Sequence, residues 1–172
     1  MLIVALTIYA IDGRPIFFIQ KRPGKDNVIF NLIKFRTMDV IGTGNKISRI
    51  TRLGKFLRSS SLDEIPSFIN IALGQMSFIG PRPLLVEYLE RYSSNQIKRH
   101  NVKPGITGLA QVNGRNAISW SDKLAFDQKY ASNISFMLDV KILIQTFIIV
   151  LKREGINSSA QETMEEFNND EK

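Results

Sequence analysis

The chain has 172 residues, which suits one domain, or one domain with a short appendage, rather than two full hydrophobic cores. Hydrophobic residues make up 44% and charged residues 23% of the sequence, a balance that argues against general disorder. The chain has no cysteine and a single histidine. This composition excludes disulfide scaffolds, thiolate zinc sites and cysteine nucleophiles, and it argues against a histidine-based metal site or a Ser-His triad.

The net charge of +7 is unevenly spread along the chain. Residues 155–172 hold five acidic residues and one basic residue, which leaves 22 basic and 11 acidic residues in 1–154, a net charge of +11. We interpret residues 155–172 as an acidic C-terminal tail. The basic body favours an anionic partner, such as nucleic acid, a phosphorylated small molecule or an acidic membrane surface.

Residues 1–10 form an apolar segment that only Thr7 interrupts. As a helix this segment would be about 15 Å long, roughly half the hydrocarbon core of a bilayer. No basic region precedes it and no small-residue cleavage site follows it, so a secretory signal is not expected. We expect a buried helix or strand, or a short membrane-associated segment.

A β-hairpin is predicted next. Residues 16–19 resemble a strand, residues 22–26 a turn, and residues 28–35 a returning strand. The end of this hairpin carries two cations, Lys34 and Arg36.

The rest of the chain is predicted to be mainly helical. Residues 76–83 contain a glycine and two prolines, which argues against regular structure there, and residues 108–112 are expected to be extended. Apolar periodicity and capping signals predict helices over residues 48–57, 61–74, 85–92, 95–100, 121–131 (capped by Ser121) and 136–152. The predicted fold class is α+β, mainly α-helical, with a small β-hairpin.

Residues 58–66 (RSSSLDEIP) contain the sharpest candidate for chemistry. Ser61 and Glu64 have the spacing of a capping box, which would make the acids structural. Alternatively, a carboxylate at a helix N-terminus stays ionised and can attack phosphorus. Successive helical residues point about 100° apart, so Asp63 and Glu64 would serve different ends, one attacking and one holding a divalent metal.

Several cations could neutralise a phosphate near this acidic pair. Lys34, Arg36 and Arg58 are candidates, and Arg82 is the strongest because Pro81 and Pro83 fix the backbone on both sides of it. Each one alone is more often a solvated surface charge. Residues 105–116 are dense in glycine and asparagine, which suits close approach of the backbone to a ligand but also a plain turn. The single histidine, His100, is predicted to be exposed.

Three blocks of sequence resemble a known family. They are residues 20–24 (QKRPG) with 34–38 (KFRTM), residues 59–83, and residues 102–120 with their PGITG and QVNGRN motifs. Together they resemble the monotopic polyprenyl-phosphate phosphoglycosyl transferases, or bacterial sugar transferases, over about residues 13–154. The resemblance is strongest to the small single-domain members that start assembly of N-linked glycans or surface polysaccharides.

The resemblance implies an activity. A sugar 1-phosphate would pass from a UDP-sugar, with an N-acetylated amino or deoxyamino sugar favoured, to undecaprenyl phosphate, and UMP would be released. Asp63 would attack the β-phosphorus to form a covalent intermediate, and Glu64 would bind Mg²⁺. The partners would be the nucleotide sugar, the lipid phosphate and the membrane that carries it, rather than nucleic acid.

The resemblance also implies roles for residues outside the acidic pair. The phosphate-binding cations would be Lys34, Arg36, Arg58, Arg82 and Arg115. The turn and positioning residues would be Pro81, Pro83, Gln111, Asn113, Asp127 and Asp139.

Members of this family usually begin with a basic flank and a longer hydrophobic segment that enters and leaves the membrane on the same side. Residues 1–12 match at most its later half, so we expect a residual membrane-associated segment, followed by a catalytic domain over 13–154 and the acidic tail. Residues 136–151 are interrupted by charged and polar residues, which predicts a core helix or an interfacial one at the cytoplasmic face of the bacterial inner membrane. The alternatives are an inactive membrane-associated fragment of such an enzyme and a basic nucleic-acid-binding module.

Overall fold

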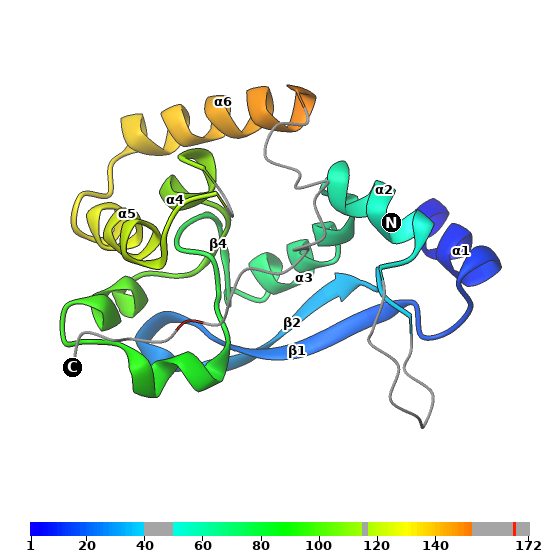
Figure 1. Cartoon of the computed structure of the whole chain (residues 1–172), viewed down its shortest axis with the longest axis horizontal. Helices are drawn as coiled ribbons and strands as arrows, with labels where there is room; N and C mark the ends of the chain where they lie inside the picture. Colours follow the sequence, from blue (N-terminus) through cyan, green and yellow to red (C-terminus); the bar gives the residue numbers. More distant parts are fainter. Residues whose placement is uncertain (40–49, 115–116, 153–166, 168–172) are drawn as a thin grey trace.

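The structure is a computed structural model, and it describes residues 1–39, 50–114, 117–152 and 167. Within these ranges, α-helices and 3-10 helices flank one antiparallel hairpin and one short parallel sheet (Figure 1). The predicted α+β class, mainly helical with a small hairpin, is confirmed. No helix in the described ranges is both long and apolar enough to cross a membrane.

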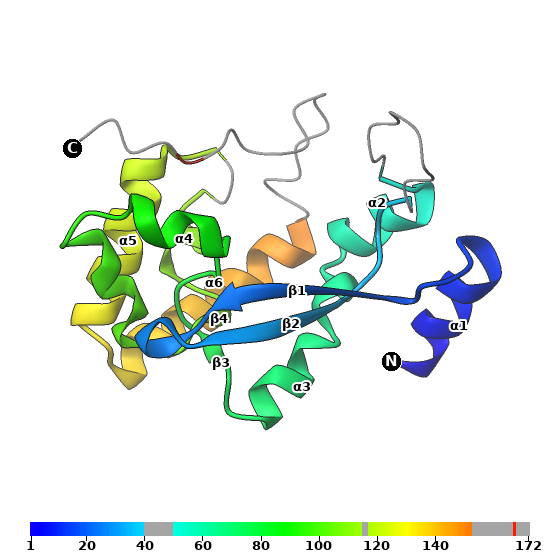
Figure 2. The ribbon, with the colours of Figure 1, turned by 90° about the horizontal axis from the view of Figure 1, so that it is seen from below.

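The hairpin runs along one side of the molecule, as Figures 1 and 2 show. Strand β1 (Phe17–Pro23) pairs with β2 (Ile29–Phe35) in a register that places Phe17 opposite Phe35 and Pro23 opposite Ile29. The predicted strands are confirmed, although β1 extends through the first two residues of the predicted turn. The 3-10 turn η1 (Lys25–Asn27) joins them, with Asp26 and Asn27 at positive φ, a conformation that these residue types tolerate.

The N-terminal segment is a helix, α1 (Leu2–Ile11), at one end of the molecule (Figure 1). Ile8 is fully buried in a cluster with Phe35 and Leu57. Most other large side chains of α1 are exposed: Leu2, Ile3, Leu6, Tyr9 and Ile11. The helix is thus attached to the domain along a narrow stripe and leaves a wide apolar face uncovered.

The predicted helix over residues 61–74 is interrupted. After α2 (Arg52–Ser59), Ser61 takes a left-handed conformation, and a single 3-10 turn, η2 (Leu62–Glu64), precedes α3 (Ser67–Ala72). Pro66 stands at the N-cap of α3, where its missing N–H costs nothing. The predicted capping box does not form, because the Ser61 side chain makes no capping hydrogen bond.

Helix α3 lies against the open edge of β2. The Asn70 side chain accepts a hydrogen bond from the amide of Ile33 at 3.1 Å and donates one to the carbonyl of Asn31 at 2.8 Å. The Ser67 hydroxyl donates to the carbonyl of Ile33 at 2.9 Å. Both side chains are buried. They satisfy backbone groups that an edge strand would otherwise leave unpaired.

Residues 76–83, predicted to be irregular, contain strand β3 (Ser77–Ile79), which pairs in parallel with β4 (Gly105–Thr107). The prediction was wrong here because the prolines follow the strand rather than interrupt it. Glycines allow the two segments to approach closely. A Cβ on Gly105 would lie 2.1 Å from the amide nitrogen of Gly80, and one on Gly108 would lie 2.1 Å from the carbonyl oxygen of Gly80.

Five helices complete the described chain: η3 (Val86–Arg91), η4 (Gln96–Asn101), α4 (Leu109–Val112), α5 (Trp120–Ser132) and α6 (Phe136–Lys152). The short helices η3 and η4 and the bounds of α6 agree with the predictions. The extended structure predicted for residues 108–112 is wrong, since α4 occupies it. Helix α5 is capped by Ser119, not by Ser121, through the Ser119 hydroxyl and the amide of Asp122 at 3.1 Å.

His100 is buried rather than exposed, with 5% of its surface accessible. Its Nδ1 lies 3.2 Å from the carbonyl oxygen of Gly24 in the hairpin turn, and its ring packs on Tyr92. Burial, together with the charge of Arg99, lowers the pKa of His100 to about 4. His100 is therefore a neutral contact between η4 and the hairpin at physiological pH.

We predict that Gly105→Ala removes more than about 3 kcal/mol of stability, because its methyl group would collide with backbone rather than with a movable side chain. Thermal unfolding followed by circular dichroism measures the effect. The matched control is Gly13→Ala: Gly13 has positive φ but open space around it, so strain alone should cost about 1 kcal/mol. Equal losses in the two variants would contradict the steric argument.

Candidate active site

A single carboxylate, Glu64, joins two cations from distant parts of the chain. Lys34, near the end of β2, donates to Glu64 Oε1 at 2.6 Å. Arg82, in the turn after β3, donates to the same oxygen at 2.8 Å. The side chains of Lys34 and Glu64 are 18% and 14% exposed, whereas that of Arg82 is 46% exposed. Glu64 thus sits at the inner end of an arginine that reaches toward solvent.

The charges of this trio depend on one another. Burial alone would raise the pKa of Glu64, but Arg82 and Lys34 outweigh it and lower that pKa to about 2. Burial and the charge of Arg82 lower the pKa of Lys34, while Glu64 acts in the opposite direction. Glu64 therefore stays ionised at any physiological pH.

Asp63 lies beside this trio on the same 3-10 turn. Burial raises the pKa of Asp63, and the charge of Glu64 raises it further. Lys34, Arg82 and Arg58 oppose the rise. Arg58, on the last turn of α2, is oriented by a hydrogen bond from its Nε to the hydroxyl of Thr37 at 2.9 Å. The two adjacent carboxylates are therefore electrostatically different, as expected of a pair with separate roles.

A pocket opens next to the trio, between the hairpin and the turn that carries Arg82. Its charged lining consists of Arg22, Lys34, Glu64 and Arg82. Its other lining residues are uncharged: Leu32, Ser67, Met76, Pro83, Leu84, Gly105 and Ile106. The lining thus carries three cations and one anion, which suits an anionic ligand.

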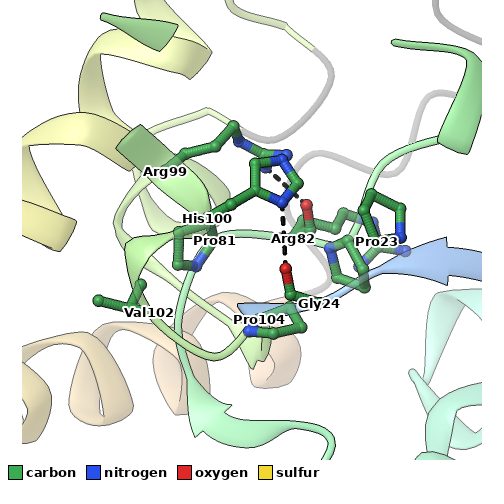
Figure 3. A pocket seen from close by; sticks show the side chains of 9 residues that line it. Pro23, Gly24, Pro81, Arg82, Arg99, His100, Val102 and Pro104 are labelled. Atoms are coloured by element: carbon green, nitrogen blue, oxygen red, sulfur yellow. Dashed lines mark hydrogen bonds between the residues drawn. The ribbon is translucent and has the colours of Figure 1, made fainter. Parts of the chain in front are cut away.

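A buried ion pair, Arg99–Asp127, holds the backbone of the turn that carries Arg82. Arg99 donates to Asp127 Oδ2 at 2.7 and 3.0 Å and to the carbonyl oxygen of Arg82 at 2.6 Å. Figure 3 shows Arg99 reaching that carbonyl, with Pro81 beside it. Arg99 and Asp127 are 2% and 1% exposed. Pro81 and Pro83 are buried on either side, so the base of the Arg82 side chain is fixed while its tip is accessible.

The structure places the other predicted residues away from Glu64. Arg36 is buried, and its guanidinium donates to the carbonyls of Asp12 and Gly13, which secures the link between α1 and β1. Asp139 accepts a hydrogen bond from the Tyr130 hydroxyl at 2.9 Å, which joins α6 to α5.

Of the three predicted site residues between β4 and α5, the structure describes Gln111 and Asn113. Asn113 donates to the carbonyl of Leu109 at 2.7 Å at the end of α4. Both polar side-chain atoms of Gln111 are buried without a hydrogen-bond partner among the described residues. Arg115 lies outside the described residues. The predicted site is thus brought together as Asp63, Glu64, Lys34, Arg58 and Arg82, with Asp127 acting through Arg99.

Sequence reasoning missed three cations near the site: Arg22, Arg99 and Lys123. Lys123, on α5, stacks 4.7 Å from the centre of the Trp120 ring, and burial together with the charge of Arg82 lowers its pKa to about 8. Arg22 was assigned to a turn, although strand alternation would have placed it on one face with Gln20. Arg99 carried no sequence signal, because its partner Asp127 lies on another helix.

The acidic pair fits a magnesium ion bound together with substrate. Both cations bind Oε1 of Glu64, and Oε2 has no hydrogen-bond partner among the described residues. In that part of the chain, no three residues of the metal-ligating types cluster. Magnesium usually needs only one or two carboxylates when substrate phosphates and water supply its other ligands. Glu64, with Asp63 adjacent, is therefore suitable to hold it.

Comparison with known proteins shows the family of this chain. The model of the bacterial sugar transferase family matches residues 1–153. The chain therefore belongs to the bacterial sugar transferase family, as its motifs predicted. By family it is a transferase enzyme.

Three relatives illustrate the similarity. The uncharacterized sugar transferase EpsL of Bacillus subtilis (strain 168) is 48% identical over 160 residues, which cover 90% of this chain and 79% of EpsL. The UDP-glucose:undecaprenyl-phosphate glucose-1-phosphate transferase of Klebsiella pneumoniae is 41% identical over 93% of this chain but only 37% of its own length. The undecaprenyl-phosphate galactose phosphotransferase of Salmonella typhimurium (strain LT2) is 36% identical over 84% of this chain and 35% of its own length.

We predict that Glu64→Gln destabilises the protein by about 2–3 kcal/mol at neutral pH and that the penalty shrinks as the pH falls. The folded-state pKa of Glu64, about 2, is below its ordinary value of 4.5. Its contribution is therefore complete above about pH 4.5 and is lost as the pH falls toward 2. Urea unfolding at pH 6 and pH 3 measures the difference. Glu87→Gln, an exposed control, should show no such change, and a pH-independent penalty for Glu64→Gln would contradict the argument.

We predict that Asp127→Asn costs about 3–5 kcal/mol, because Arg99 would remain buried without its counter-charge. The exposed Glu90→Gln should cost less than about 0.5 kcal/mol. The double variant Arg99→Met/Asp127→Leu should recover much of the loss, since it buries no unpaired charge. Chemical denaturation of the variants checks this, and a double variant that is the least stable would refute the ion-pair account.

Proposed function

We propose that the chain transfers a sugar 1-phosphate from a UDP-sugar to undecaprenyl phosphate and releases UMP. Family membership and the names of the Klebsiella and Salmonella relatives support this general reaction. The observation that carries the proposal here is the Asp63–Glu64 pair, held beside a cationic pocket by Lys34 and Arg82. Phosphoryl transfer depends mainly on positioning and charge stabilisation, which these residue types supply.

In the proposed reaction, Asp63 is the nucleophile. A carboxylate oxygen of Asp63 attacks the β-phosphorus, and the bond from that phosphorus to the oxygen shared with the α-phosphate breaks, so UMP leaves with the electron pair. A phosphate oxygen of the lipid then attacks the same phosphorus and breaks the bond to Asp63. The aspartate is regenerated, and the sugar 1-phosphate ends on the lipid as a diphosphate.

The neighbouring residues stabilise charge in both steps. Lys34, Arg58 and Arg82 favour the ionised form of Asp63, which attack requires. Arg82 and Lys34 would offset the charge that develops on the phosphate oxygens. When bound at Glu64, Mg²⁺ would neutralise part of the diphosphate charge.

The sugar is proposed to be an N-acetylated amino or deoxyamino sugar, because the sequence most resembles the small family members. The Klebsiella and Salmonella relatives are named for glucose and galactose, which makes these two sugars the direct competitors. Assays of UMP release with UDP-N-acetylglucosamine, UDP-N-acetylgalactosamine, a UDP-bacillosamine-type sugar, UDP-glucose and UDP-galactose would distinguish them.

We further propose that the protein works at the cytoplasmic face of the bacterial inner membrane, where its lipid substrate would be found. Large apolar side chains are exposed on α1 and on α6, where Phe136, Met137, Phe147 and Leu151 are each more than 60% exposed. The charge of +11 over residues 1–154 would add attraction to anionic lipid.

The test is Asp63→Asn in the full chain, assayed for Mg²⁺-dependent UMP release. We expect loss of at least about 10³-fold in kcat and no transfer of label from a β-³²P UDP-sugar to the protein. Because the pKa of Asp63 is raised, its charge opposes folding at neutral pH, so the variant should be at least as stable as the wild type. Full activity in the variant would show that Asp63 is not the nucleophile. Chelation with EDTA should abolish wild-type turnover, and added Mg²⁺ should restore it.

A further inference from the structure

Arg22 lies in the QKRPG motif, but it has no role among the predicted site residues or in the reaction above. It lies on β1, one residue before the end of the strand, and lines the same pocket as Lys34 and Arg82. Its Nη2 donates to Oε1 of Gln20 at 2.6 Å. Its Nε is buried and has no hydrogen-bond partner among the described residues. A guanidinium held by a neutral amide therefore faces the pocket with donor capacity to spare.

The pocket lining has an excess of positive charge, to which Arg22 contributes. Lys34 and Arg82 share the carboxylate of Glu64, while Arg22 donates its hydrogen bond to an uncharged amide, that of Gln20. Burial and the nearby charge of Arg82 lower the pKa of Arg22 to about 10, which leaves it charged at physiological pH. The lining therefore has a net charge of two positive units, and an anion in the pocket would relieve the repulsion between Arg22 and Arg82.

We propose that Arg22 binds a phosphate group of a substrate, together with Lys34 and Arg82, and so holds that phosphate beside Asp63. This inference rests on the proposed function. A guanidinium presents a planar fork of donors that matches two phosphate oxygens. Arg22 lies on the hairpin and Arg82 lies in the turn after β3, and both side chains line the pocket. A phosphate between them would receive donors from two separate elements.

Two ligands could supply this phosphate, the nucleotide diphosphate and the lipid phosphate. Steady-state kinetics with each substrate varied in turn distinguishes them. We expect Arg22→Gln to raise the KM for one substrate by about tenfold to a hundredfold, the value of one charge-assisted contact. A rise for the UDP-sugar assigns Arg22 to the nucleotide, and a rise for undecaprenyl phosphate assigns it to the lipid. Arg22→Lys, which keeps the charge but loses the fork, should lie between the wild type and Arg22→Gln.

The matched control is the next residue back along the strand. Lys21 carries the same charge but is exposed, whereas Gln20 and Arg22 are half-buried, so alternation places it on the other face of β1. Lys21→Gln should leave both KM values within about twofold of wild type, because a distant exposed charge is screened. If Lys21→Gln weakens binding as much as Arg22→Gln, only net charge matters and the proposal fails.

A binding measurement separates this proposal from the proposed function. Isothermal titration of the full chain with pyrophosphate, and separately with UDP, needs no turnover. Weaker binding of either probe by Arg22→Gln, but not by Lys21→Gln, would support the anion site even if no UDP-sugar were a substrate. Unchanged binding of both probes together with unchanged KM values would overturn it. Should Arg22→Gln unfold at a lower temperature, the same comparison is made with Arg22→Lys.

Discussion

The carboxylate of Glu64 is the point where three segments of the domain meet. It binds Lys34 from the hairpin and Arg82 from the turn after β3, and it lies on the 3-10 turn between α2 and α3. A half-buried charge of this kind must be paired, so the positions of the three segments are not independent. Asp63 precedes Glu64 directly, and its place beside the cations follows from that pairing. The second support, from Arg99 and Asp127, fixes the Arg82 backbone instead of its tip.

The local backbone makes this use of Glu64 possible. In one continuous helix, Glu64 would turn back to cap the helix start at Ser61. The left-handed conformation of Ser61 separates the acidic turn from α2, and Pro66 begins a new helix after it. A continuous helix through Glu64 therefore does not form. The acidic turn therefore stands between two helices, and Glu64 is available to pair with Lys34 and Arg82, which are distant in the sequence. The pattern that indicated a cap from sequence alone is the same pattern that the fold uses for the site.

Sequence predicted the elements whose stabilising contacts are local. The long helix α6 and the hairpin follow from periodicity, and both were placed closely. Strands β3 and β4 have three residues each and exist because they pair with each other across more than twenty residues, so no local pattern identifies them. The same holds for the site. The acidic pair and Arg82 stand in recognisable motifs, whereas the burial of Arg99 depends on Asp127, and that of His100 on the hairpin turn.

The glycines that let β3 and β4 approach each other closely bear on how relatives of this chain should be recognised. Gly80, Gly105 and Gly108 are required by backbone spacing alone, whatever reaction the domain performs. A homologue that had lost both acidic residues would still need these glycines to fold, and would still match the Pro-Gly-Ile-Thr-Gly segment. In a genome survey, that segment would therefore report the scaffold, and under the proposed mechanism the Asp-Glu pair would separate competent enzymes from inactive copies of it.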